Sequence, residues 1–120
     1  MNLTPDWLSL THEETIDPAL AICDPHHHLW RNRSNSLPST YLLDEFLSDI
    51  HTGEHNIVSS VFIECGTMFS PDGPVDLRPV GETQFAHDMA TMSASGLYGP
   101  TRVAAGIVGT AFLSAGDSVA

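Results

Sequence analysis

Apolar residues recur along the chain with two different periods, and these periods predict five elements of secondary structure. Runs of strand length, rich in β-branched or small apolar residues, lie at residues 20–23, 57–63 and 102–109. Between them, apolar residues recur at helical spacing in residues 41–53 and again in residues 80–95. The predicted order is therefore strand, helix, strand, helix, strand.

Residues that favour turns and caps set the expected ends of these elements. Asp24-Pro25 should end the first strand, because proline has no backbone N–H group to donate to a neighbouring strand. Ser39 or Thr40 should cap the first helix, and Gly96 should close the second. The side chains that we expect the two helices to bury are Leu42, Leu43, Phe46, Leu47 and Ile50, followed by Phe85, Met89 and Met92.

The connections between the strands predict how the strands pair. No Asn-Gly hairpin turn joins them, and a helix separates each consecutive pair, which is typical of a parallel sheet built from right-handed βαβ units. We therefore expect an α/β fold. Residues 1–19 would be a leading segment whose Trp7 and Leu8 cover apolar surface, and residues 20–120 would form the domain.

Composition narrows the class of protein and of partner. A chain of 120 residues with 42% hydrophobic residues has the size and apolar content of one globular domain. Four arginines, no lysine and fifteen acidic residues give a net charge of −11, which argues against nucleic-acid binding and against docking on anionic membranes. The N-terminus lacks the features of a signal peptide, and two cysteines fit a reducing compartment, so we expect a cytoplasmic protein.

Three consecutive histidines in the stretch ICDPHHHLW follow the first predicted strand. Parallel α/β folds bind ligands at the carboxyl ends of their strands. Alternation along an extended chain would place Asp24, His26 and His28 on one side and His27 on the other. Glu64 follows the end of the second strand, so we expect it at the same rim.

The chemistry of these residues suggests a site for a metal ion or a substrate. Imidazoles two residues apart can both bind one Zn²⁺, and Asp24 can orient a ligand histidine. Arg78 can hold a substrate carboxylate with two hydrogen bonds, and Glu64 can contact substrate. The simpler alternatives are a hydrogen-bonded histidine pair in a turn, a surface arginine, and a glutamate paired with Arg78 or Arg102.

The stretch D-P-H-H-H-L-W resembles the D-x-H-x-H signature of the amidohydrolase superfamily. The greatest resemblance is to its amidohydrolase-2 group of TIM-barrel hydrolases, which includes sugar lactonases and dicarboxylate lactone hydrolases. The stretches FIECGTMF, LRPVGETQFAHDMA and GLYGPTRVAAGIVG are similar to the second and third strands of that group with their flanking segments. The resemblance implies parallel (β/α) units that correspond to the first three strands of a TIM (β/α)₈ barrel.

This resemblance also implies a reaction, in which water attacks the carbonyl of a small-molecule lactone, ester or amide. His26 and His28 would be catalytic, as the first two metal ligands. The cofactor would be a divalent metal ion, zinc in the first place, or none, since some lactonases of the group use the same histidines without metal. A barrel takes about 250 residues, so we expect residues 20–120 to be its N-terminal part, inactive alone because the later ligands and the catalytic aspartate are missing.

Three alternatives remain open at this point. The chain would be a non-catalytic fragment that requires a complementary chain or a second copy of itself, because three parallel strands leave an open edge. It would otherwise be a small metal-binding module. A metal-dependent decarboxylase on the same scaffold is the third alternative, since a scaffold does not determine a reaction.

Overall fold

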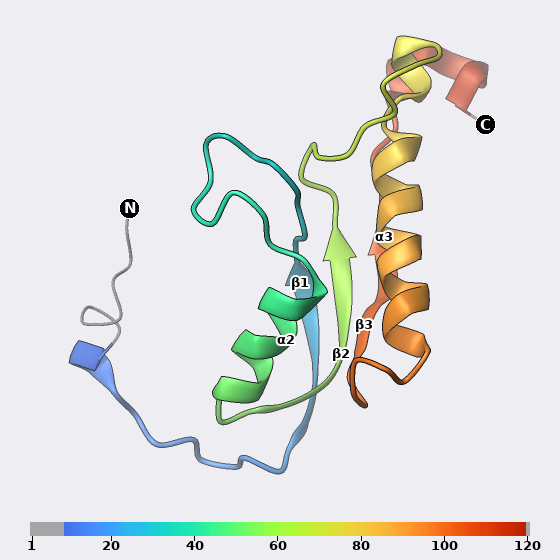
Figure 1. The fold of residues 1–120 in the computed structure, drawn as a ribbon. Coiled ribbons are helices and arrows are strands. Elements are labelled where there is room, and N and C mark those ends of the chain that lie inside the picture. The colour runs from blue at the N-terminus through green and yellow to red at the C-terminus, as the bar shows by residue number, and fades with distance from the viewer. Residues whose placement is uncertain (1–8, 120) are drawn as a thin grey trace.

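Three parallel strands and two helices form the centre of the computed structural model, which describes residues 9–119 (Figure 1). The strands are arranged in the order β1-β2-β3, and both neighbouring pairs are parallel. The α/β class and the parallel sheet predicted from the sequence are therefore confirmed. Along the chain the elements are β1 (Ala21–His27), α2 (Leu43–Thr52), β2 (Asn56–Ile63), α3 (Val80–Ala94) and β3 (Arg102–Val108).

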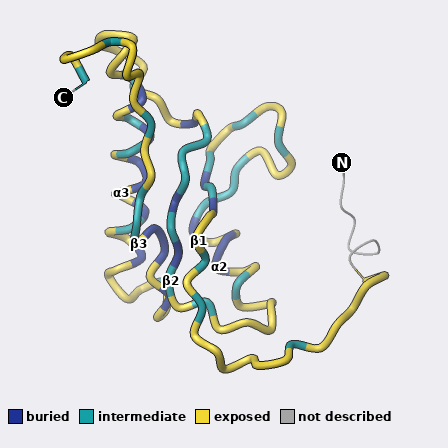
Figure 2. The backbone as a smooth tube through the Cα atoms, turned by 180° about the vertical axis from the view of Figure 1, so that it is seen from behind, coloured by how far each residue is buried: buried dark blue, intermediate teal, exposed yellow. Residues whose placement is uncertain are grey.

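Both helices lie on the same side of the sheet, and no helix of the described residues covers the opposite side (Figures 1 and 2). Along β2, Ser60 and Phe62 are buried, whereas the alternating residues Ile57, Val61 and Ile63 are only half-buried. This alternation gives one packed face and one partly open face. The buried apolar core between the sheet and the helices consists of Leu29, Leu43, Phe46, Leu47, Phe62, Phe85, Ala86, Met89, Val103 and Ala104.

The first helix begins later than the sequence predicted. Helix α2 starts at Leu43, and the side chain of Glu45 accepts a hydrogen bond from the backbone nitrogen of Leu42 at 2.8 Å. The expected cap by Ser39 or Thr40 is wrong. The Thr40 hydroxyl accepts a hydrogen bond from the backbone nitrogen of Asn32, so it closes the preceding loop instead of capping the helix.

Helix α3 has the expected bounds within one residue, and Gly96 follows its end with a φ of 81°. Phe85 and Met89 are buried as predicted. The placement of Met92 in the core is wrong, since 39% of this side chain is exposed. The hydroxyl of Ser93 lies on the buried stripe in its place, where it donates to the carbonyl oxygen of Thr101 and accepts from the backbone nitrogen of Val103.

Strand β1 continues through Asp24-Pro25 to His27, so the predicted end of this strand is wrong. Asp24 lies beside Ser60 and His27 beside Phe62, which means that three steps along β1 match two along β2. This is a β-bulge, and a bulge on an edge strand is where a sheet tolerates a proline without a ladder hydrogen bond. The strand therefore includes His26 and His27, and His28 follows its last residue.

The leading segment packs little against the domain. A short 3-10 helix, Ser9–Thr11, precedes an extended stretch that approaches β1, and Leu10 and Ile16 are exposed. The predicted roles of Trp7 and Leu8 lie outside the described residues. Within residues 9–119, no helix has the length and apolar character that a membrane span requires.

Candidate functional site

Two of the three consecutive histidines come together at the carboxyl end of β1. The Nε2 atoms of His26 and His28 are 3.2 Å apart. Their ring planes are nearly perpendicular, at 89°, with ring centroids 4.9 Å apart. The spacing predicted that these two side chains would share one side of the strand, and the short distance between their ring nitrogens agrees with it.

The backbone of the neighbouring strand determines which nitrogen of His28 carries the proton. Nδ1 of His28 lies 2.8 Å from the carbonyl oxygen of Ile63, the last residue of β2. A carbonyl oxygen can only accept a hydrogen bond, so Nδ1 must donate. In neutral His28 the Nε2 atom is then left with a free lone pair that points toward His26.

The distance between the two Nε2 atoms fits a shared metal ion. Two imidazole nitrogens bound to one tetrahedral Zn²⁺, each at about 2.0–2.1 Å, would be roughly 3.3 Å apart. The observed 3.2 Å matches this separation, and it also fits a direct N–H···N hydrogen bond from His26 to His28. In residues 9–119 no group of three or more His, Cys, Asp and Glu side chains is arranged to hold a metal ion, so the pair supplies two ligands and no more.

His27 belongs to the helix-facing side of the sheet, as its position in the alternation predicted. Its ring stacks on Phe46 with centroids 4.4 Å apart, and 6% of the residue is exposed. Within residues 9–119, neither ring nitrogen has a hydrogen-bond partner. Burial lowers the pKa of His27 from 6.5 to about 4, although the negative charge of Asp24 acts in the opposite direction. His27 is therefore a neutral core residue.

Asp24 contacts the backbone of the histidine segment rather than a histidine ring. Its Oδ1 atom accepts a hydrogen bond from the backbone nitrogen of His26 at 3.1 Å. This bond spans two residues, as in the Asx turns that fix local backbone conformation. Asp24 thus shapes the bulge that carries His26, and no hydrogen bond links it to an imidazole.

The predicted substrate-binding residues differ in their distance from the histidine pair. Glu64 directly follows Ile63, and its backbone nitrogen donates to the carbonyl oxygen of Val108. Arg78 lies in the loop before α3, where its Nε atom donates to the carbonyl oxygen of Gly73 at 3.2 Å. Glu64 therefore directly follows the residue whose carbonyl oxygen bonds to His28, whereas Arg78 closes a loop.

Neither predicted arginine pairs with Glu64. Arg102 is the first residue of β3, whereas Glu64 bonds to Val108, the last residue of that strand, so the two lie at opposite ends of β3. The arginine that reaches the end of β2 is Arg33, which sequence reasoning missed. Its Nη2 atom donates to the carbonyl oxygen of Cys65 at 2.6 Å.

Glu82 was also missed. Only 1% of this residue is exposed, and its carboxylate accepts hydrogen bonds from the backbone nitrogens of Cys65, Gly66 and Thr67 at 2.8, 3.3 and 3.2 Å. Burial, and then the negative charge of Glu82, raise the pKa of the Cys65 thiol. The sequence does indicate that Glu82 is buried, because it lies on the same helical stripe as the apolar residues Phe85 and Met89.

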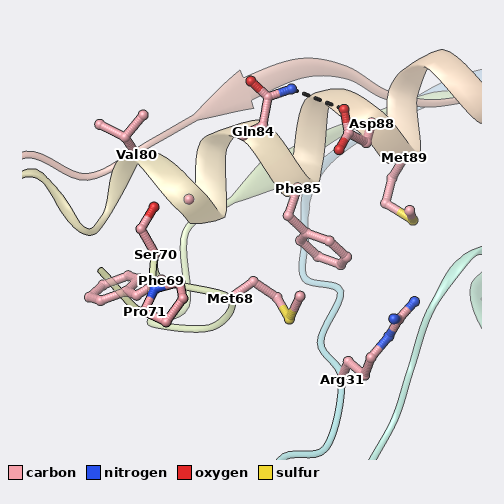
Figure 3. A pocket seen from close by; sticks show the side chains of 11 residues that line it. Arg31, Met68, Phe69, Ser70, Pro71, Val80, Gln84, Phe85, Asp88 and Met89 are labelled. Atoms are coloured by element: carbon pink, nitrogen blue, oxygen red, sulfur yellow. Dashed lines mark hydrogen bonds between the residues drawn. The ribbon is translucent and has the colours of Figure 1, made fainter. Parts of the chain in front are cut away.

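A separate hollow of about 800 Å³ lies between the first half of α3 and the loop after β2 (Figure 3). Met68, Phe85 and Met89 line it with apolar surface, while Arg31 and Asp88 add charged groups. Neither His26 nor His28 lines this hollow, so it is distinct from the histidine pair.

No protein-family model, curated protein or solved structure gives a significant match to this chain. The geometry of the residues themselves is therefore the basis for assigning a function.

Proposed function

We propose that this chain is the N-terminal part of an amidohydrolase-type barrel hydrolase and contributes the first two imidazoles of its site. One observation carries the proposal: the Nε2 atoms of His26 and His28 converge at the carboxyl end of the first parallel strand, 3.2 Å apart. Ligands of parallel α/β folds bind at this end of the sheet. The reaction would be attack of water on the carbonyl carbon of a lactone, ester or amide.

In the metal-dependent form, His26 and His28 would hold a divalent ion, with Zn²⁺ as the first choice for two imidazole ligands. The ion would supply a Lewis acid that polarises the substrate carbonyl. The hydrogen bond from Nδ1 of His28 to the carbonyl oxygen of Ile63 supports this form, because it keeps the lone pair of Nε2 free for a ligand bond.

In the metal-free form, the same residues would contact the substrate directly. Neutral His26 can carry its proton on Nε2 and donate it to a carbonyl oxygen, while His28 stays fixed by the Ile63 carbonyl group. Glu64, one residue beyond Ile63, would then lie at the edge of the same site. This hydrogen bond from His26 would stabilise the negative charge that develops on the carbonyl oxygen.

The first experiment measures Zn²⁺ binding to the purified chain and to a His26→Ala/His28→Ala double variant. We expect one weakly bound ion per chain, and at least a tenfold loss of affinity in the variant because both ligand nitrogens are removed. His51→Ala/His87→Ala is the matched control, since both of these histidines are exposed on helices. Equal binding by all three proteins would contradict the metal-dependent form.

We further expect the 120-residue chain alone to hydrolyse simple lactones no faster than buffer does. In residues 9–119 no carboxylate hydrogen-bonds to the His26 or His28 ring, so neither imidazole has a neighbouring base to activate water. A panel of γ- and δ-lactones, followed by acid release at constant pH, tests this expectation. Turnover that disappears in the His26→Ala/His28→Ala variant would contradict it.

A non-catalytic role that requires a partner is the second candidate, and the exposed sheet favours it. Strands β1 and β3 each have one edge without a partner strand in the described residues, and 49% of Val108 is exposed. Open parallel edges promote association with another chain. Molar mass measured by light scattering across a hundredfold range of concentration would reveal association with a second copy.

A further inference from the structure

The turn that follows β2 is held by a carboxylate from inside the protein. Cys65, Gly66 and Thr67 point three successive backbone N–H groups at the buried side chain of Glu82. Gly66 has a φ of 73°, and this left-handed conformation lets consecutive N–H groups converge on one anion. Glu82 comes from the first turn of α3, so it links that helix to the end of β2.

The peptide groups on either side of Glu64 are fixed one after the other. The carbonyl oxygen of Ile63 accepts a hydrogen bond from His28 Nδ1, and the N–H group of the same peptide donates to the carbonyl oxygen of Val108. The next N–H group, that of Cys65, donates to Glu82 at 2.8 Å. Glu82 therefore restrains the chain one peptide beyond the group that orients His28.

Arg33 holds the same turn from the other side. It lies in the loop that follows β1, five residues beyond His28, and donates to the carbonyl oxygen of Cys65 at 2.6 Å. The N–H group of Cys65 thus bonds to α3, while its carbonyl oxygen bonds to the loop that follows β1. A charged group makes each of these hydrogen bonds, and such bonds are stronger than those between neutral groups.

We infer that Glu82 is a positioning residue for the histidine pair and acts together with Arg33 through the 65–67 turn. Its effect is to keep the Ile63 carbonyl group in place, so that Nδ1 of His28 donates and Nε2 remains a lone-pair donor facing His26. This inference rests on the proposed function only in taking His26 and His28 as the site. It adds two residues, from different elements, on which the geometry of that site depends.

A purely structural role for Glu82 would have a different consequence. Loss of three buried hydrogen bonds would lower the free energy of unfolding, yet His28 would keep its proton on Nδ1 in the molecules that remain folded. A positioning role requires that the protonation of the ring changes in the folded protein. The ¹⁵N chemical shifts of the His28 imidazole distinguish the two tautomers and do not depend on global stability.

The experiment compares Glu82→Gln with Asp88→Asn, a matched loss of charge at an exposed position on the same helix. In Glu82→Gln we expect the ¹⁵N shifts of His28 to move toward a mixture of tautomers, and Zn²⁺ affinity to fall about tenfold, as is typical when a residue behind a metal ligand is changed. Asp88→Asn should leave both unchanged. A folded Glu82→Gln protein with unaltered ¹⁵N shifts overturns the inference.

Arg33 provides the same test on a half-buried residue, which matters if Glu82→Gln does not fold. Arg33→Met removes the donor to Cys65 and should shift the His28 tautomers in the same direction. Arg33→Lys keeps a cationic donor and should restore them in part. Unchanged tautomers in Arg33→Met also overturn the inference. If the wild-type chain binds no Zn²⁺ but its tautomers respond to Arg33→Met, the metal-dependent function fails while the positioning role of the turn stands.

Discussion

Replacement of Gly81 by alanine is expected to destabilise the protein by about 3 kcal/mol, although alanine is usually favoured over glycine within a helix. Gly81 is the second residue of α3, and a Cβ atom added there would lie 2.4 Å from the backbone nitrogen of Ser70 and 2.7 Å from the carbonyl oxygen of Met68. Backbone atoms cannot move aside as a side chain can. The 68–70 segment would therefore have to move away from the helix.

Chemical denaturation measures this effect, and Gly106→Ala is the matched control. The three atoms nearest to a Cβ atom at Gly106 all belong to the side chain of Val61, and the shortest distance, 3.4 Å, is close to ordinary contact. We expect this control to change the free energy of unfolding by less than about 1 kcal/mol. If Gly81→Ala proves as stable as the wild type, the loop after β2 is not packed against the first turn of α3.

The order of elements and most of their bounds could be predicted from the sequence, because they depend on local periodicity. The 80–95 helix and the 57–63 strand differ from α3 and β2 by one residue at one end. The two wrong boundaries depend on tertiary structure. Pro25 is accommodated by a bulge on an edge strand, and the side chain of Glu45 satisfies a donor that Thr40 was expected to satisfy.

The histidine pair could be predicted because alternation along a strand is a local property. The two residues that bond to Cys65 could not be predicted in the same way. Glu82 is 17 residues from Cys65 along the chain, and Arg33 is 32 residues from it. An acidic residue on an apolar helical stripe indicates a buried partner, yet it does not identify that partner. Arg33 was missed for the same reason, because it lies in a loop whose path the sequence does not determine.

The first turn of α3 holds the segment that follows β2 in place. The first turn of α3 supplies both Gly81, which lets the 68–70 segment approach, and Glu82, which binds the 65–67 turn. Ser70 also donates to the carbonyl oxygen of Arg78, immediately before the helix. The position of α3 therefore determines where the chain runs beyond Ile63, and thus the surroundings of the histidine pair.

Replacement of His27 by phenylalanine is expected to stabilise the protein and to remove part of its sensitivity to acid. In the folded protein burial lowers the pKa of His27 to about 4, while in the unfolded chain it stays near 6.5. Above pH 6.5 both states are neutral, and this histidine adds no pH dependence. As the pH falls from 6.5 to 4, only the unfolded chain gains the proton, so the folded state loses stability, by at most about 3 kcal/mol.

Phenylalanine would keep the stacking on Phe46 and would not take up a proton. It would also remove two buried ring nitrogens that have no hydrogen-bond partner among the described residues, which should add about 1–2 kcal/mol of stability at pH 7. Denaturation at pH 7.5, 5.5 and 4.5, with a chelator present, measures both effects. His51→Gln is the control, because replacing an exposed histidine on α2 should change neither the stability at pH 7 nor the sensitivity to acid.

If the His27→Phe protein loses as much stability between pH 7.5 and 4.5 as the wild type does, His27 is not the neutral core residue that its surroundings indicate. The acid sensitivity would then originate from the carboxylates of this acidic chain.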